Sequence, residues 1–346
     1  MQEIAKLKEV LQSPQNIIIT THQKPDADAL GSSLGLYNYL LSEGHEVTVI
    51  SPTDYPDFLK WMKGNDKVIV YNEGNEKASE ELVANSDLIF CLDFSALGRI
   101  NGLGEHVRSS SAKKVLIDHH RDPEDFADFV SHDINSASTA QLVYKMIVAF
   151  GDKKQITKEI AECLYAGIMT DTGSFKHPNT NKEVHEIVAQ LIDLGANNSE
   201  VSRLIYDTNS LDRLKFLGYA LSQRLEVFPA QHAAFFKVTL EDLKKFNSKT
   251  GDTEGLVNYA LSIDGITMAA LFTETEDGTK LSLRSIGEFE VNSLANFYFN
   301  GGGHKNAAGG KTSLNINDTV ELFKKIINQY TKELKNKKAI TNYENL

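Results

Sequence analysis

Histidine and aspartate side chains gather at four places in the sequence, in a combination that suits metal binding. Six of them are candidate metal ligands: His22, Asp26, Asp28, Asp93, His119 and Asp171. Carboxylates with some imidazole and no thiolate favour Mn²⁺ or Mg²⁺ over structural Zn²⁺. One octahedral ion with its waters does not need six protein ligands, whereas two ions about 3.5–4 Å apart would use them all with one carboxylate bridging. Such a pair suits phosphoryl displacement, because it holds both the attacking and the leaving oxygen.

Each of these residues also has a structural interpretation when it is taken alone. An aspartate before a helix is commonly an N-cap, and a single aspartate after a strand is often a turn residue. A purely structural origin of all four clusters needs four independent coincidences. The pair His119-His120 is the most specific feature, because two polar side chains directly after an apolar strand have no packing purpose.

The elements around these residues predict how they are brought together. Short apolar runs alternate with helical segments in the first half of the chain, which predicts a parallel sheet with helices on both faces. The predicted strands are 16–21, 45–50, 67–71, 87–93 and 114–118, and a helix is predicted at 29–42. His22, Asp93 and His119 come at the carboxyl ends of strands, where open α/β sheets bind their ligands.

The predicted secondary structure changes twice in the rest of the chain. A helical block follows the sheet, with helices predicted at 138–150, from 157 to about 171, and at 181–194, 198–209 and 211–223. A smaller α+β module comes next, with strands at 226–228, 233–239, 266–273 and 280–285, a turn at Asp277-Gly278, and helices at 291–299 and 317–334. These patterns predict a first domain at 1–194, a helical linker at 195–224, a second domain at 225–336 and a polar, frayed tail at 337–346.

Composition narrows the classes of function. The 346 residues include 47 acidic and 36 basic side chains, which give a net charge of −11. The chain therefore lacks the excess of basic residues that is typical of proteins that bind long nucleic acids. Two cysteines, Cys91 and Cys163, make no disulfide framework. We find neither a signal segment nor an apolar run near the roughly 20 residues of a membrane helix, and we therefore expect a cytoplasmic protein without a membrane partner.

At this point the residues resemble a known family, the DHH phosphoesterases. Asp118-His119-His120 is similar to its signature triplet, the spacing from His22 to Asp28 resembles its first motif, and Asp93 and Asp171 resemble its second and fourth. Gly301-Gly302-Gly303-His304, followed by Ala307-Ala308-Gly309, resembles the glycine-rich motif of the DHHA1 domain. The likeness extends from about residue 16 to about residue 334. It implies an α/β fold, a DHH domain followed by a smaller α+β DHHA1 domain, with the active site in the cleft between them.

The resemblance also implies roles for individual residues. His22, Asp26 and Asp93 would hold one ion, and a second would be held by Asp28, Asp93, His119 and Asp171, with Asp93 as the bridge. Asp118 would orient a ligand histidine through its ring N–H. The residues implied at the reacting phosphate, besides Asp93, are His120 and Arg99. The residues implied in binding the nucleotide end of the substrate are Arg284, Ser285, Gly302, Gly303 and His304, together with Arg99.

The length of the chain favours the short two-domain members of the family, the bacterial nanoRNases. The predicted function is hydrolysis of very short RNA and of small nucleotides, such as pAp and linear dinucleotides, by a hydroxide activated by two ions. Mn²⁺ is the expected metal, with Mg²⁺ or Co²⁺ as alternatives, and no long duplex is expected as a partner. Three other functions stay open: a cyclic or linear dinucleotide (c-di-AMP, pApA) phosphodiesterase, a pyrophosphate or polyphosphate hydrolase, and a non-catalytic nucleotide-binding regulator. The oligomeric state, a homodimer included, is open as well.

Overall fold

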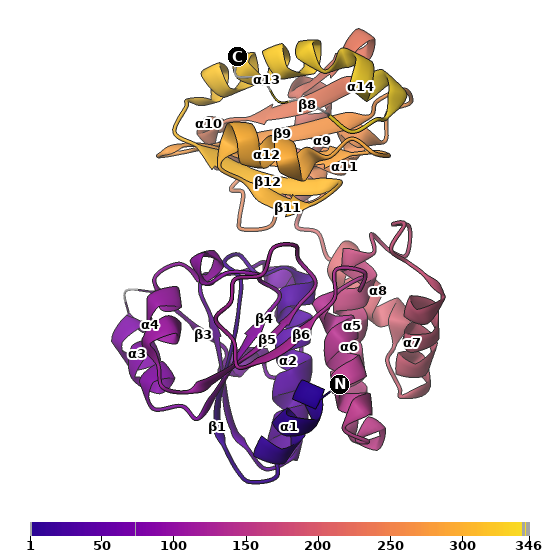
Figure 1. The fold of residues 1–346 in the computed structure, drawn as a ribbon. Coiled ribbons are helices and arrows are strands. Elements are labelled where there is room, and N and C mark those ends of the chain that lie inside the picture. Colours follow the sequence, from indigo (N-terminus) through magenta and orange to yellow (C-terminus); the bar gives the residue numbers. More distant parts are fainter. Residues whose placement is uncertain (1, 73, 341–342, 344–346) are drawn as a thin grey trace. The chain divides into compact units, whose positions relative to one another are not determined.

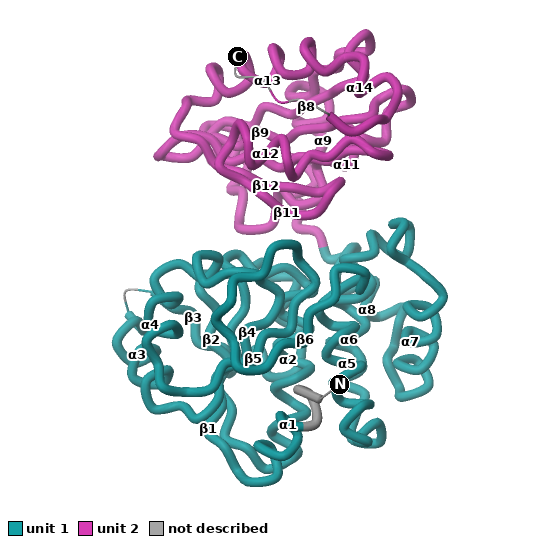
Figure 2. Tube along the Cα trace, in the orientation of Figure 1, with its two compact units in different colours: residues 1–208 teal, residues 209–346 magenta. Residues whose placement is uncertain are grey.

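The computed structural model describes residues 2–72, 74–340 and 343. The chain divides into two units, Met1–Thr208 (unit 1) and Asn209–Leu346 (unit 2), which Figure 2 colours separately. The division falls inside the predicted linker. Of the predicted tail, residues 341–342 and 344–346 lie outside the described residues.

Unit 1 is built on a sheet of six parallel strands in the order β3-β2-β1-β4-β5-β6. The strands are β1 (Asn16–Thr21), β2 (Glu46–Ser51), β3 (Ile69–Val70), β4 (Leu88–Leu92), β5 (Lys113–Asp118) and β6 (Phe129–His132). The chain proceeds outward from β1 to β3 and then returns to start β4 on the other side of β1. The topological switch point, where doubly wound sheets bind ligands, therefore lies between β1 and β4.

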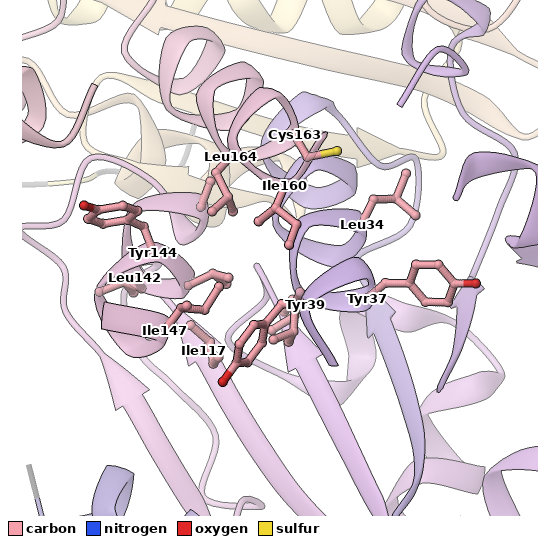
Figure 3. Close-up of a cluster of buried hydrophobic side chains, with 14 of the residues drawn as sticks. Leu34, Tyr37, Tyr39, Ile117, Leu142, Tyr144, Ile147, Ile160, Cys163 and Leu164 are labelled. Carbon is pink, nitrogen blue, oxygen red and sulfur yellow. The ribbon is translucent and has the colours of Figure 1, made fainter. Parts of the chain in front are cut away.

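Helices cover both faces of this sheet (Figure 1). They are α1 (Gln2–Val10), α2 (Ala27–Ser42), α3 (Glu76–Ala84), α4 (Leu103–Ser109), α5 (Thr139–Ala149), α6 (Lys158–Asp171), α7 (Lys182–Asp193) and α8 (Asn198–Tyr206). Alternate residues of β1 pack on opposite sides: Ile17 and Ile19 against the larger core with α2, α5 and α6, and Ile18 against the core with α3 and α4. Figure 3 shows part of the larger core, to which Leu34, Ile147 and Ile160 belong, with Ile160 between the other two in this view.

Unit 2 contains a mixed sheet in the order β11-β12-β10-β9-β8-β7, in which only β8 and β9 pair in parallel among the described residues. The strands are β7 (Leu225–Phe228), β8 (Ala233–Val238), β9 (Met268–Thr275), β10 (Gly278–Ser285), β11 (Gly302–His304) and β12 (Ala307–Thr312). The helices are α9 (Leu211–Gln223), α10 (Leu240–Lys245), α11 (Leu256–Leu261), α12 (Val291–Phe299), α13 (Ile316–Gln329) and α14 (Thr331–Asn336). The α/β sheet unit followed by a mixed-sheet unit confirms the predicted fold class.

Several elements escaped the sequence prediction. The edge strand β6 and the short helices α1, α10 and α11 were not predicted, and the predicted last helix breaks at Tyr330 into α13 and α14. The glycine run forms a hairpin, β11–β12, although glycine disfavours strands. Its tight pairing requires glycine, because a Cβ at Gly301 would lie 2.1 Å from the Gly309 carbonyl oxygen, and Gly303 has a φ of +138°.

Candidate metal centre

The six predicted ligands of unit 1 come together at the carboxyl ends of neighbouring strands. His22 follows β1, Asp93 follows β4 and His119 follows β5, so that the topological switch point lies between the first two. Asp171 ends α6, and Asp26 is the N-cap of α2, where its Oδ1 accepts the backbone N–H groups of residues 28 and 29.

The side chains form two groups, each with one donor atom per residue and all donor atoms within 4.8 Å of one another. Ligand group 1 consists of His22, Asp26 and Asp93, and ligand group 2 consists of Asp28, His119 and Asp171. In group 1, His22 Nε2 lies 3.9 Å from Asp26 Oδ2. In group 2, His119 Nε2 lies 3.9 Å from Asp28 Oδ2 and 3.2 Å from Asp171 Oδ2.

Asp93 connects the two groups. Its Oδ2 lies 3.4 Å from His22 Nε2, and its Oδ1 lies 3.4 Å from His119 Nε2, so one carboxylate directs one oxygen at each group. Asp93 has a φ of +64° and donates its backbone N–H to the Ile117 carbonyl oxygen at 3.1 Å. Aspartate tolerates this left-handed conformation better than most residues, and here it occurs where the chain leaves β4.

Burial and mutual charge perturb the carboxyl groups of the centre. Burial, with the charges of Asp93 and Asp171, raises the pKa of Asp28 well above its usual range. Burial likewise raises the pKa of Asp171 to about 7, although the charge of His119 lowers it. Asp93 behaves in the opposite way: burial favours its neutral form, but hydrogen bonds from His119 and His22 hold its pKa well below the usual range.

The histidines respond to the same charges. Burial opposes protonation of His22, yet its hydrogen bond to Asp93 and the charges of Asp26 and Asp93 raise its pKa to about 9. The pKa of His119 is raised for similar reasons, against its burial, by the hydrogen bond to Asp93 and the charge of Asp171. The centre therefore attracts positive charge, either as protons or as cations.

The donor set fits two divalent cations. When ionised, as metal binding requires, the carboxylates of Asp26, Asp28, Asp93 and Asp171 would carry four negative charges, which two divalent ions would balance. Each histidine directs its Nδ1 at a backbone carbonyl oxygen, that of Gln23 at 2.8 Å for His22 and that of Ser136 at 3.2 Å for His119. The carbonyls fix the proton on Nδ1 and leave Nε2 facing the carboxylates, the arrangement found in ligating histidines, which release a proton when metal binds.

Asp118 orients a different histidine from the one expected. Its Oδ1 accepts a hydrogen bond from His120 Nδ1 at 2.7 Å, whereas the ring of His119 is oriented by the Ser136 carbonyl. The reason is local, because residues two apart at a strand end point to the same side. Asp118 is fully buried, and its Oδ2 has no hydrogen-bond partner among the described residues.

Arg99 lies near the centre in sequence and is held there through its backbone. It belongs to a short 3₁₀ turn after β4 (Leu97–Ile100), and its carbonyl oxygen accepts the N–H of Gln23, the neighbour of His22, at 2.9 Å. Glu124 supports the same turn by accepting the Leu97 N–H at 3.0 Å. No hydrogen bond or salt bridge joins the Arg99 guanidinium to another residue in the described part of the chain.

Sequence reasoning missed the start of α5. Asp28 accepts the Thr139 backbone N–H on Oδ2 at 2.7 Å and the Ala140 backbone N–H on Oδ1 at 2.9 Å. The Thr139 hydroxyl donates to Asp93 Oδ1 at 2.8 Å. The sequence predicts a helix at 138–150, but which carboxylates the start of that helix meets is decided by tertiary packing.

Five of the residues predicted to bind substrate lie on two strands of unit 2. Arg284 and Ser285 end β10, and Gly302, Gly303 and His304 form β11. Ser285 is buried and engaged within the unit: its hydroxyl donates to the Phe289 carbonyl oxygen at 2.5 Å and accepts from Asn306 Nδ2 at 2.9 Å. Gly302, by contrast, has open space where a side chain would lie.

Comparison with known proteins agrees with this architecture. Residues 16–168 match the DHH family, N-terminal domain, and residues 233–333 match the DHHA1 domain. The bifunctional oligoribonuclease and PAP phosphatase NrnA of Thermus thermophilus is 31% identical over 337 residues, which cover 96% of this chain and 94% of the relative. The protein of the same name from Bacillus subtilis is 29% identical, over 85% of this chain and 88% of the relative. The crystal structure of an exopolyphosphatase-related protein from Bacteroides fragilis matches with a TM-score of 0.91 and 38% identity, over 96% of this chain and 98% of that one.

A parallel-sheet unit with a His/Asp centre, followed by a mixed-sheet unit, thus defines a hydrolase acting on phosphoester bonds. The chain belongs to the DHH/DHHA1 phosphoesterase family, which confirms the resemblance drawn from its motifs. Among the described residues, no helix has the length and apolar character needed to cross a bilayer.

Proposed function

We propose that this chain is a cytoplasmic, two-metal phosphohydrolase that degrades very short RNA and dephosphorylates or cleaves small nucleotides such as pAp and linear dinucleotides. The observation that carries the proposal is the orientation of Asp93. Its two oxygens lie 3.4 Å from the Nε2 atoms of two different histidines, His22 and His119, as a carboxylate bridging two cations requires. The names of the NrnA relatives support the choice of substrates.

Two bound divalent ions, most readily Mn²⁺, would lower the pKa of a water and offset the charge that develops on the phosphate oxygens. Side chains of the protein supply the other interactions with the reacting phosphate. The Asp118 carboxylate holds the His120 Nδ1–H at 2.7 Å and so fixes the ring, and we assign to His120 Nε2 a hydrogen bond or proton for a phosphate oxygen. Arg99 is assigned to the same phosphate, because its backbone is tied to Gln23 beside His22.

Unit 2 is proposed to bind the part of the substrate that does not react. Arg284, Gly302, Gly303 and His304 are the residues assigned to this role, with Ser285 at the end of the same strand as Arg284. The charge distribution supports such a division, because unit 1 has 31 acidic and 19 basic residues whereas unit 2 has 16 and 17. An acidic catalytic unit repels a long polyanion except where cations are bound, which favours short substrates.

A panel assay tests this function. Purified protein, freed of metal with EDTA and resupplied with Mn²⁺, is incubated with pAp, pApA, pGpG, a five-residue RNA and pyrophosphate. Turnover of the nucleotides that disappears with EDTA and returns with Mn²⁺ is the expected result. Turnover that persists in EDTA would contradict the metal centre.

A second candidate is hydrolysis of pyrophosphate or polyphosphate, favoured by the likeness to the exopolyphosphatase-related protein from Bacteroides fragilis. We assign the glycine-rich hairpin of unit 2 to a nucleotide rather than to a bare phosphate chain, since Gly302 leaves open space on it where a ligand could approach the backbone. Pyrophosphate, or added polyphosphate, turned over faster than every nucleotide in the panel would establish this second function instead of the first.

A further inference from the structure

Thr139 contacts carboxylates from both ligand groups with two separate donors. It is the first residue of α5 and is fully buried. Its backbone N–H donates to Asp28 Oδ2 at 2.7 Å, and its hydroxyl donates to Asp93 Oδ1 at 2.8 Å. One side of the residue therefore meets group 2, and the other meets Asp93, the carboxylate of group 1 that connects the two groups.

Helix capping explains the contact of the Thr139 N–H with Asp28 but not the contact of its hydroxyl with Asp93. The Ser138 side chain caps α5 by accepting the Gln141 N–H at 3.1 Å. The backbone N–H groups of Thr139 and Ala140 have no acceptor within the helix, because they lie in its first turn, and both donate to the Asp28 carboxylate. An anion is favoured there by the partial positive charge of the helix N-terminus. The Thr139 hydroxyl has no part in this capping, and its hydrogen goes to Asp93.

The Thr139 hydroxyl restricts the rotation of the Asp93 carboxylate group about its terminal torsion. The terminal torsion of an aspartate is broad, so a carboxylate rotates readily about its own axis. Asp93 bridges the two groups only in an orientation that sends Oδ1 toward His119 and Oδ2 toward His22. A hydrogen bond to Oδ1 from a fully buried side chain of a neighbouring helix selects that orientation.

We propose that Thr139 is a positioning residue of the metal centre: its hydroxyl sets the rotation of the bridging carboxylate of Asp93, and its backbone N–H ties that carboxylate to the position of Asp28. The inference rests on the proposed function, since it concerns the same centre. Partners that orient metal ligands typically contribute 10- to 100-fold to metal affinity.

The test compares Thr139→Val with Thr139→Ser in the full chain. Valine keeps the branched shape and the backbone N–H but removes the hydroxyl, whereas serine keeps the hydroxyl. Thr20→Val is the matched control, because Thr20 is a fully buried threonine of unit 1 whose hydroxyl has no hydrogen-bond partner among the described residues. Metal-free proteins are titrated with Mn²⁺ while the electron paramagnetic resonance signal of free Mn²⁺ is followed, and their thermal unfolding is recorded.

We expect Thr139→Val to bind at least one Mn²⁺ ion about 10- to 100-fold more weakly, with little change in the unfolding temperature of the metal-free protein. Thr139→Ser and Thr20→Val should bind like the wild type. At saturating Mn²⁺, Thr139→Val should lower kcat on a dinucleotide more than it raises KM. If valine prevents folding, Thr139→Ala replaces it, since alanine also lacks the hydroxyl and favours helices.

Unchanged Mn²⁺ affinity in the hydroxyl-free variant would overturn the inference while leaving the proposed function intact. The same holds if Thr139→Ser loses as much affinity as Thr139→Val, because packing would then be the role of the residue. A wild-type protein that binds no Mn²⁺ would overturn the proposed function and, with it, this inference.

Discussion

The substitution Gly167→Ala should disable the metal centre although it replaces none of the candidate ligands. Gly167 lies in α6 where this helix packs against α2, and a Cβ added there would lie 2.6 Å from Asp28 Oδ1 and 2.7 Å from the Ala140 Cβ. Carbon atoms in contact prefer about 3.5–4.0 Å, so one neighbour, or α6 itself, must move by roughly 0.8 Å or more. Either movement disturbs the hydrogen bond from the Ala140 N–H to Asp28 Oδ1.

Two magnitudes follow from this displacement. Overpacking of a tight interior costs typically about 1–3 kcal/mol of stability. A catalytic group displaced by about 1 Å can lower the rate on the order of 100-fold. We therefore expect weaker Mn²⁺ binding and a large loss of kcat on a dinucleotide, with a moderate fall in the thermal unfolding temperature.

Two other glycine-to-alanine changes separate the causes. A Cβ at Gly35, also in the α2–α6 contact, would crowd the Leu164 side chain, with Cδ2 at 2.8 Å and Cγ at 3.0 Å, and would meet no group of the metal centre. Gly35→Ala should therefore lower stability with little effect on metal affinity. Gly218→Ala places a Cβ in open space on α9 and should raise stability by up to about 1 kcal/mol through helix propensity. If Gly167→Ala kept wild-type Mn²⁺ affinity and turnover, the close contact of α6 with Asp28 would have no part in the centre.

Four further outcomes are expected. Asp93→Ala should abolish turnover, because this carboxylate would serve both ions. A variant that keeps more than about a tenth of the wild-type turnover, which corresponds to a barrier change under about 1.4 kcal/mol, would refute the bridging role. RNA of about two to five nucleotides should be cut far faster than a strand of about 30, so comparable rates in a gel assay would refute the length limit. Arg284→Ala should raise KM for a dinucleotide roughly 10- to 100-fold but hardly affect a small aryl phosphodiester, whereas His120→Ala should slow both; equal losses for Arg284→Ala on both substrates would contradict a binding role. Finally, burial raises the pKa of Asp242, but hydrogen bonds from Arg224 and from the Thr239 backbone outweigh burial and lower this pKa to about 2. The ionised Asp242 therefore stabilises the fold above its unfolded pKa, and this stabilisation is lost as the pH falls through 2. Asp242→Asn should thus cost about 2 kcal/mol at pH 6 and about 1 kcal/mol at pH 3, and an equal cost in urea unfolding at both pH values would disprove the ion-pair explanation.

The sequence was informative where function follows from the position of a residue on the sheet. His22, Asp93 and His119 could be predicted to meet because the carboxyl ends of parallel strands share one edge, whatever the loops do. Asp171 was harder to place by that rule, since it ends a helix and does not follow a strand. The structure places all four within the two ligand groups.

The contacts that escaped prediction depend on packing and on side-chain orientations that the sequence pattern does not specify. That Thr139 meets Asp28, 111 residues earlier, follows from how α5 lies across α2. That Asp118 orients His120 and not His119 depends on where each ring points after β5 ends. The β11–β12 hairpin escaped prediction because glycine-rich runs usually indicate loops, and here glycine is needed for backbone contact.

The centre also explains why so much of unit 1 converges on a few carboxylates. Burying several like charges is unfavourable, and the raised pKa values of Asp28 and Asp171 express first their burial and then the repulsion between neighbouring carboxylates. Asp28 is held in place all the same, because two backbone N–H groups at the start of α5 bind it and because Gly167 leaves room for it beside α6. The chain therefore preorganises a site with an excess of negative charge by means of neutral donors, and cations restore the balance more fully than protons do, since each divalent ion offsets two carboxylates. A fold that maintains this arrangement favours cations at the centre, and in the proposed function their charge would stabilise the phosphate oxygens during hydrolysis.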